Sequence, residues 1–221
     1  MSAPARPVSG YREVMKHGRI VLDNAIDQFT LLAHAADPDA ALDATGLDLR
    51  RLPPDVRASL YSAAAVFRVR SLRSSGDLTA NKAVFFSAPE LRTAGNISAT
   101  HAQVFEIPQL QNAGNIFATS AEEFVAHELV AAGDIDAFGA ANFEAQSLRT
   151  AGYINAYFTK CFRVLQLREC RTLRVPSVRI FVAPELRSAS VVDALQATWI
   201  IAPLPNPGRI FAQEAGYSLS A

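Results

Sequence analysis

The chain repeats one hydrophobic pattern at a fixed interval of nineteen residues. Leucine occurs seven times at this interval, from Leu72 to Leu186. Counted from each leucine, glycine returns at position 5 of the first five units and is replaced by Arg171 and Ser190 in the last two, and apolar or small residues return at positions 7, 9, 12, 15 and 17. The consensus is L-x-x-A-G-x-I-x-A-x-x-A-x-x-F-x-A-P-x, and a shorter eighth unit starts at Leu204 if the seventh loses one residue. A fixed period of this kind predicts a solenoid.

The spacing inside one unit predicts two short strands. The pairs I-x-A and F-x-A have the period of two that is typical of a strand with one buried face, and the remaining steps of three indicate corners. Glycine before the first strand suits a corner with positive φ, and proline after the second suits a corner that donates no hydrogen bond. Nineteen residues are too few for a helix-turn-helix unit. We therefore expect a mainly β fold, a parallel β-solenoid of seven to eight coils about 4.8 Å apart, with leucine, isoleucine and phenylalanine inside.

The run L-x-x-A-x-x-I-x-A-x-x-A resembles the leucine-rich-repeat pattern L-x-x-L-x-x-L-x-L-x-x-N, and in particular the short, proline-bearing repeats of bacterial leucine-rich-repeat proteins. The resemblance covers residues 72 to about 215 and implies a right-handed solenoid that recognises a partner and carries no catalytic residues. The sequence departs from that family at two points. The next apolar residue comes three positions later instead of two, and alanine replaces the family's asparagine at Ala83, Ala102, Ala121 and Ala140. A plain parallel β-helix therefore stays open as the cross-section.

Residues 1–71 precede the repeat and are expected to cover its first coil, because an uncovered sheet edge promotes aggregation. One apolar stripe with helical spacing supports an α-helical cap here. The stripe consists of Leu22, Ile26, Phe29 and Ala33. An independent function for this segment is the weaker alternative.

Two interpretations of residues 53–69 stay open. The segment begins with Pro53 and reads as a second helix, or as a decayed first coil, since Ala64 and Phe67 fall on the consensus. We expect a solenoid over 72–215 and a short C-terminal tail over 216–221.

Composition argues against several functional classes. The 221 residues carry 21 Lys or Arg and 21 Asp or Glu, a balance that does not favour nucleic acid or an anionic membrane. Two cysteines are too few for a disulfide scaffold, and no His/Cys spacing indicates a metal site, so we expect neither metal nor cofactor. The N-terminus lacks a Sec signal peptide, and no apolar run is long enough to span a membrane. We expect a cytoplasmic protein or one injected into a host cell.

The sequence does not predict an enzyme. It contains no G-x-S-x-G, P-loop or H-E-x-x-H motif, and its four histidines are scattered. Asp134 and Asp136 flank Ile135 and are interpreted as solvated residues more readily than as a catalytic pair. An enzyme that acts on polysaccharide remains a minor alternative.

The candidate binding site is a group of outward-pointing aromatic residues in coils three to five. Phe138 and Tyr157 share position 10 of adjacent coils, and Phe158 follows directly. Exposed aromatic side chains are typical of binding surfaces. We expect the site to consist of Phe117, Asp136, Phe138, Tyr153, Asn155 and Tyr157, with an unidentified protein as partner and an effector- or inhibitor-like role of bacterial type. Burial under a loop or the cap, or a dimer contact, is the alternative.

Charge is distributed unevenly along the repeats. Residues 72–147 carry three Lys or Arg and nine Asp or Glu, whereas residues 148–187 carry eight and two. This asymmetry supports two further hypotheses, a rod that self-associates through opposite charges and a basic patch that meets an acidic partner. The patch comprises Arg163, Arg168, Arg171, Arg174 and Arg179.

Overall fold

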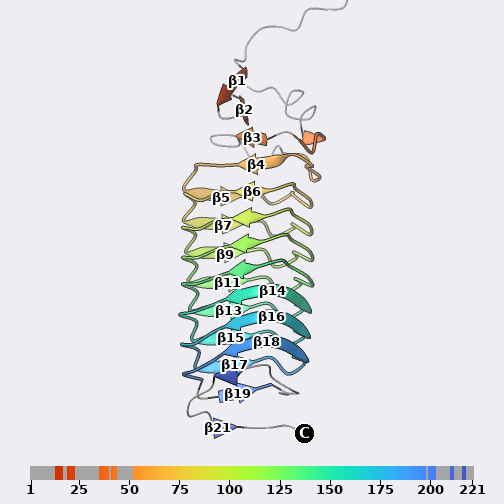
Figure 1. Cartoon of the computed structure of the whole chain (residues 1–221). Helices are drawn as coiled ribbons and strands as arrows, with labels where there is room; N and C mark the ends of the chain where they lie inside the picture. The colour runs from red at the N-terminus through yellow and green to blue at the C-terminus, as the bar shows by residue number, and fades with distance from the viewer. Residues whose placement is uncertain are drawn as a thin grey trace, which may run out of the picture.

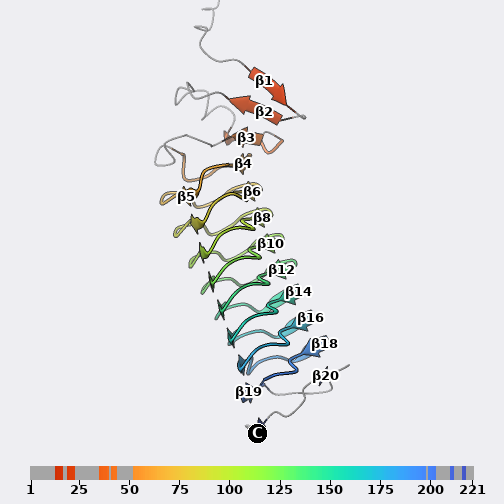
Figure 2. The ribbon, with the colours of Figure 1, turned by 90° about the vertical axis from the view of Figure 1, so that its left-hand side faces the viewer.

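The computed structural model has the expected architecture, a stack of coils that each contribute one strand to each of two parallel sheets (Figure 1). The structure describes residues 13–16, 19–22, 35–39, 41–43, 52–197, 199–202, 210–211 and 216–217, and side chains within 35–39, 52–197 and 200–202. Figure 2 shows the coils stacked into a rod with the two sheets along its opposite sides.

The first sheet has ten strands, in the order β20-β18-β16-β14-β12-β10-β8-β6-β4-β3. Neighbouring strands of the repeat pair in parallel with a register of nineteen residues, as in Ile97, Ile116 and Ile135. The strands are β3 (Ala41–Asp43), β4 (Ser59–Tyr61), β6 (Leu78–Thr79), β8 (Ile97–Ser98), β10 (Ile116–Phe117), β12 (Ile135–Asp136), β14 (Thr150–Asn155), β16 (Glu169–Arg174), β18 (Ser188–Asp193) and β20 (Ile210–Phe211).

The second sheet has nine strands, in the order β21-β19-β17-β15-β13-β11-β9-β7-β5. They are β5 (Val66–Arg68), β7 (Phe85–Ser87), β9 (Val104–Glu106), β11 (Glu123–Val125), β13 (Asn142–Glu144), β15 (Cys161–Arg163), β17 (Ile180–Val182), β19 (Trp199–Ile201) and β21 (Gly216–Tyr217). A separate antiparallel pair is formed by β1 (Glu13–Lys16) and β2 (Arg19–Leu22).

The core lies between the two sheets and is built from identical positions stacked on each other. Phenylalanine at position 15 forms one continuous column from Phe67 to Phe181, with ring centroids 4.5–5.4 Å apart. These rings are fully buried, as are the leucines at position 1 and the isoleucines at position 7 in the middle coils. The predicted internal columns are therefore confirmed.

The two-sheet cross-section decides between the two solenoid types. A leucine-rich-repeat coil has one strand and a helix or 3₁₀ segment on its other side. Here the F-x-A segments form a second parallel sheet. The chain is thus a two-sheet parallel β-solenoid, and its likeness to leucine-rich repeats is a likeness of sequence pattern.

The solenoid extends upstream of Leu72. Residues 53–69 form a coil of the solenoid, the second of the two interpretations, and not a helix. This stretch holds β4 and β5, which continue the two sheets. The apolar stripe expected to form a helical cap lies outside the described residues, apart from Leu22 in β2. Of the tail over 216–221, the structure describes β21, which pairs with β19.

Glycine at position 5 of four consecutive coils, from Gly95 to Gly152, makes room for a side chain of the preceding coil. The sequence predicts a corner with positive φ, but none of the repeat glycines that the structure describes has a φ in the left-handed region. Instead, a Cβ on Gly114 would lie 2.7 Å from Oδ1 of Asn96 in the preceding coil. That oxygen accepts a hydrogen bond of 2.8 Å from the backbone N–H of Asn115. The glycine therefore makes room for an inter-coil hydrogen bond.

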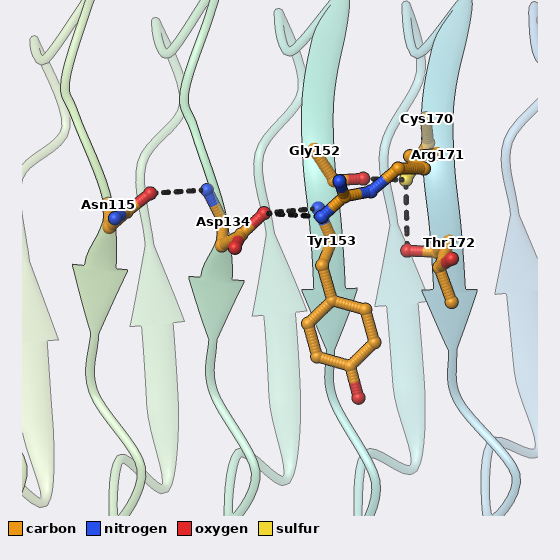
Figure 3. Close-up of polar contacts among 7 residues, drawn as sticks. All are labelled: Asn115, Asp134, Gly152, Tyr153, Cys170, Arg171 and Thr172. Carbon is orange, nitrogen blue, oxygen red and sulfur yellow. Dashed lines mark hydrogen bonds and ion pairs between the residues drawn. The ribbon is translucent and has the colours of Figure 1, made fainter.

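This contact recurs as a ladder of Asn and Asp side chains at position 6. Asp77, Asn96, Asn115 and Asp134 each accept a bond of 2.7–2.8 Å from the position-6 N–H of the next coil. The ladder ends at Tyr153, as Figure 3 shows. In the coil after Tyr153 the position-5 residue is Arg171, where the preceding coil has no carboxylate or amide at position 6 that needs the space.

Candidate functional site

Four of the six predicted site residues lie on the outer side of the first sheet, and the other two, Phe138 and Tyr157, lie in the turns that follow β12 and β14. Strand pairing places Phe117 beside Asp136 and Asp136 beside Asn155, each at position 8 of its coil. The inward residues between them, such as Ile135 and Ala137, are buried in the core. Alternation along β14 therefore turns positions 6 and 8 outward together, and position 10 follows in the turn after the strand.

Three aromatic rings at the end of this surface contact one another. Phe138 stacks on Tyr157 with centroids 5.4 Å apart, and Phe158 meets both rings edge-on at 4.9 and 5.0 Å. Phe138 is 40% exposed and Phe158 is 53% exposed. Among the described residues, the loops and strands leave these rings open to solvent.

Phe158 belongs to this cluster although it is not among the six residues. The sequence marks it as an outward aromatic residue, but its position 11 falls in a corner whose direction the spacing does not define. In the structure the corner turns its ring back onto Tyr157 and Phe138.

Arg174, which the sequence assigns to the basic patch, also lies beside this cluster. It lies at position 8 of the coil after Asn155, and its guanidinium carbon is 5.6 Å from the centroid of the Tyr157 ring. Its Nε is also 3.8 Å from Oδ2 of Asp193. We use the name aromatic strip for Phe158 and Arg174 together with Phe117, Asp136, Phe138, Tyr153, Asn155 and Tyr157.

Asp136 supplies a carboxylate beside the rings. Nδ2 of Asn155 donates a hydrogen bond of 3.0 Å to its Oδ1. Burial raises the pKa of Asp136 above its ordinary value, while hydrogen bonds from the backbone of Phe138 and from Asn155 oppose the rise. Oδ1 of Asn155 is buried and lacks a hydrogen-bond partner among the described residues. The polar part of the strip is thus partly desolvated and incompletely satisfied.

Tyr153 occupies the other end of the strip, at position 6. Its backbone N–H donates to Asp134 as the last step of the ladder. Figure 3 shows its ring extending along β14 in the direction of the strand. The side chain is half-buried, so it contributes less open area than Phe158.

The predicted basic patch does not form one surface. Arg163 lies in β15 and Arg179 directly before β17, both in the second sheet. Arg171 and Arg174 lie in β16 of the first sheet, and Arg168 directly precedes this strand. Arg168 is paired with Glu185 at 3.0 Å, and Arg171 lies 3.7 Å from Asp134. These arginines face carboxylates of their own chain, which reduces their capacity to attract an acidic partner.

The two thiols have different environments. Cys170 is buried, and its Sγ lies 3.3 Å from the carbonyl oxygen of Gly152 and 3.2 Å from that of Thr172, the two acceptors for its single S–H (Figure 3). Burial raises the pKa of this thiol to about 12. Cys161 is half-buried at the outer side of β15. Cys170 is therefore a structural thiol and a poor nucleophile.

Metal ligation and membrane spanning find no support in the described part of the chain. Residues 35–39, 52–197 and the short segments beyond contain no group of three or more His, Cys, Asp or Glu placed to hold a metal ion. No helix within these segments has the length and apolarity to cross a bilayer.

No protein-family model, curated protein or solved structure matches this chain.

Proposed function

We propose that this protein is a non-enzymatic recognition module whose aromatic strip binds a protein partner. The observation that carries the proposal is the open three-ring cluster of Phe138, Tyr157 and Phe158. Exposing such a cluster to water is unfavourable, and its burial against a partner would recover the hydrophobic free energy.

The rings are also well placed for the centre of an interface. They sit on a rigid stack of hydrogen-bonded coils and restrain one another by mutual contact. Aromatic side chains with few free torsions lose little entropy when a partner covers them. Preorganisation of this kind favours binding without a conformational change.

The polar neighbours favour protein over nucleic acid as the partner. Asp136 places a carboxylate next to the rings, and Arg174 is already close to Asp193. A phosphate backbone would meet repulsion from the first group and limited attraction from the second. A peptide surface can offer Asp136 a hydrogen-bond donor and can place apolar side chains on the rings.

The test compares the wild-type protein with the double variant Phe138→Ser/Tyr157→Ser. Affinity capture from the natural host identifies candidate partners, and calorimetry with the purified partner measures affinity. We expect the double variant to bind at least about tenfold more weakly, because the loss of two hot-spot rings costs more than ~1.4 kcal/mol.

The control is Val66→Ser/Val84→Ser, which removes two apolar side chains that are 58% and 47% exposed and distant in the chain from the strip. This variant should retain wild-type affinity. If the strip variant folds normally and binds the partner as tightly as the wild type, the aromatic strip is not the binding site.

A further inference from the structure

Between β9 and β17, the outer face of the second sheet separates negative from positive charge along the rod. We define its acidic half by Glu106, Glu122, Glu123 and Glu144, which lie in or next to β9, β11 and β13. We define its basic half by Lys160, Arg163 and Arg179, which lie in or next to β15 and β17. The two halves meet between β13 and β15.

Strand register places these charges in consecutive coils of one continuous sheet. Glu123 pairs with Asn142, Asn142 with Cys161 and Cys161 with Ile180. With coils about 4.8 Å apart, the centres of the two halves lie about 11 Å from each other along the rod. At the boundary Glu144 contacts both His127, at 3.2 Å, and Arg163, at 4.0 Å.

The same face carries exposed apolar side chains among the charges. Ile180 is 44% exposed, and Val104, Val125 and Val182 are half-buried on the outer side of their strands. A regular sheet face with apolar side chains and balanced opposite charges is suited to pack against another sheet about 10 Å away.

We infer that two copies of this chain pair through their second sheets, antiparallel and face to face, about a two-fold axis between β13 and β15. This rotation brings the acidic half of each copy opposite the basic half of the other, so that both contacts are attractive. A parallel pairing in register would place like charges opposite each other. The pair is closed, since each copy uses the same surface once.

This dimer is independent of the proposed partner site. The aromatic strip lies on the first sheet and in the turns that follow β12 and β14, whereas both charged halves lie in or next to strands of the second sheet, which runs along the other side of the rod (Figure 2). Dimerisation would therefore present two strips and raise the avidity for a multivalent partner.

Sedimentation equilibrium of the full chain tests the inference at 50 and 500 mM NaCl. We expect a dimer whose dissociation constant rises at least about tenfold between these concentrations, because salt screens exposed charges. Across the two-fold axis, β11 of one copy faces β17 of the other. Two charge-reversal variants, Glu122→Lys/Glu123→Lys and Arg179→Glu, are therefore each expected to be monomeric. Mixed in equal amounts, they should form a heterodimer, since every contact between them again joins opposite charges.

Rescue in the mixture separates loss of the interface from loss of the fold, and circular dichroism of each variant checks the fold directly. A monomeric wild-type protein at both salt concentrations would overturn the inference. So would wild-type dimerisation of either charge-reversal variant, or a mixture that stays monomeric. Loss of the dimer in Phe138→Ser/Tyr157→Ser would place the contact on the aromatic strip and would equally overturn it.

Discussion

The replacement of Gly114 by alanine tests whether the position-6 ladder dictates glycine at position 5. A Cβ at this site would lie 2.7 Å from Oδ1 of Asn96 and 3.3 Å from two backbone atoms, N of Asn96 and C of Gly95. The shortest of these contacts requires Asn96 to turn away. Its oxygen then loses the hydrogen bond of 2.8 Å from the backbone N–H of Asn115.

The expected magnitude combines two opposing contributions. Loss of one such hydrogen bond costs about 0.5–1.5 kcal/mol, and crowding against the two backbone atoms adds to it. Alanine restricts the unfolded chain more than glycine does, which raises the free energy of unfolding by about 0.4–1 kcal/mol. We expect Gly114→Ala to lower the free energy of unfolding by about 1 kcal/mol. In an Asn96→Ala background, where the bond is already absent and space is available, the same change should cost about zero.

Urea unfolding followed by circular dichroism measures the four proteins of this double-mutant cycle. The comparison holds if the m-value is constant across the set, because repeat arrays can lose cooperativity. Ser190→Ala is the matched control at position 5, two coils beyond the end of the ladder, and should change stability by less than about 0.5 kcal/mol. An equal cost of Gly114→Ala in both backgrounds would show that the glycine is not required by Asn96, and the reasoning would be wrong.

Three further predictions follow from the core, the thiols and the strip. Phe124→Ala should lower the free energy of unfolding by about 3–5 kcal/mol, because this fully buried ring is stacked on both sides; a loss below about 1 kcal/mol in urea unfolding would contradict a packed core there. At pH 8, a thiol reagent should label Cys161 and leave Cys170 unmodified in the folded protein, since burial raises the pKa of the Cys170 thiol to about 12; rapid labelling of both thiols would refute this. Asp136→Asn should stabilise the protein at pH 7, because burial raises the folded-state pKa and the charged form is therefore disfavoured in the fold. That gain should shrink as the pH falls through the folded pKa towards the unfolded value, and a gain that does not depend on pH would contradict the assigned cause.

The sequence alone determined the architecture of the repeat. Identical residues at intervals of nineteen can all be buried together only if each unit places them at the same point of a coil, and period-two pairs define which of them lie on strands. The inward columns of leucine, isoleucine and phenylalanine follow from that condition. Strand alternation likewise places Phe117, Asp136 and Asn155 in one outward row.

Corners and contacts between coils were decided only by the tertiary structure. The regular spacing of glycine located the corner, but the sequence suggested a positive φ as the reason for glycine there. The side chain that a Cβ would meet in the middle coils, an Asn or Asp, lies in another coil. The direction of the corner after Tyr157 brings Phe158 into the aromatic cluster, and no periodicity defines it.

The distribution of arginine shows the same limit. Five arginines within seventeen residues of sequence suggested one patch, yet a coil returns through both sheets in nineteen residues, so Arg163 and Arg174 lie on different faces. The stacking of coils also places Glu185 beside Arg168 and Asp134 beside Arg171. A one-dimensional pattern specifies how coils repeat, whereas the surface each side chain faces depends on the path of the chain around the coil.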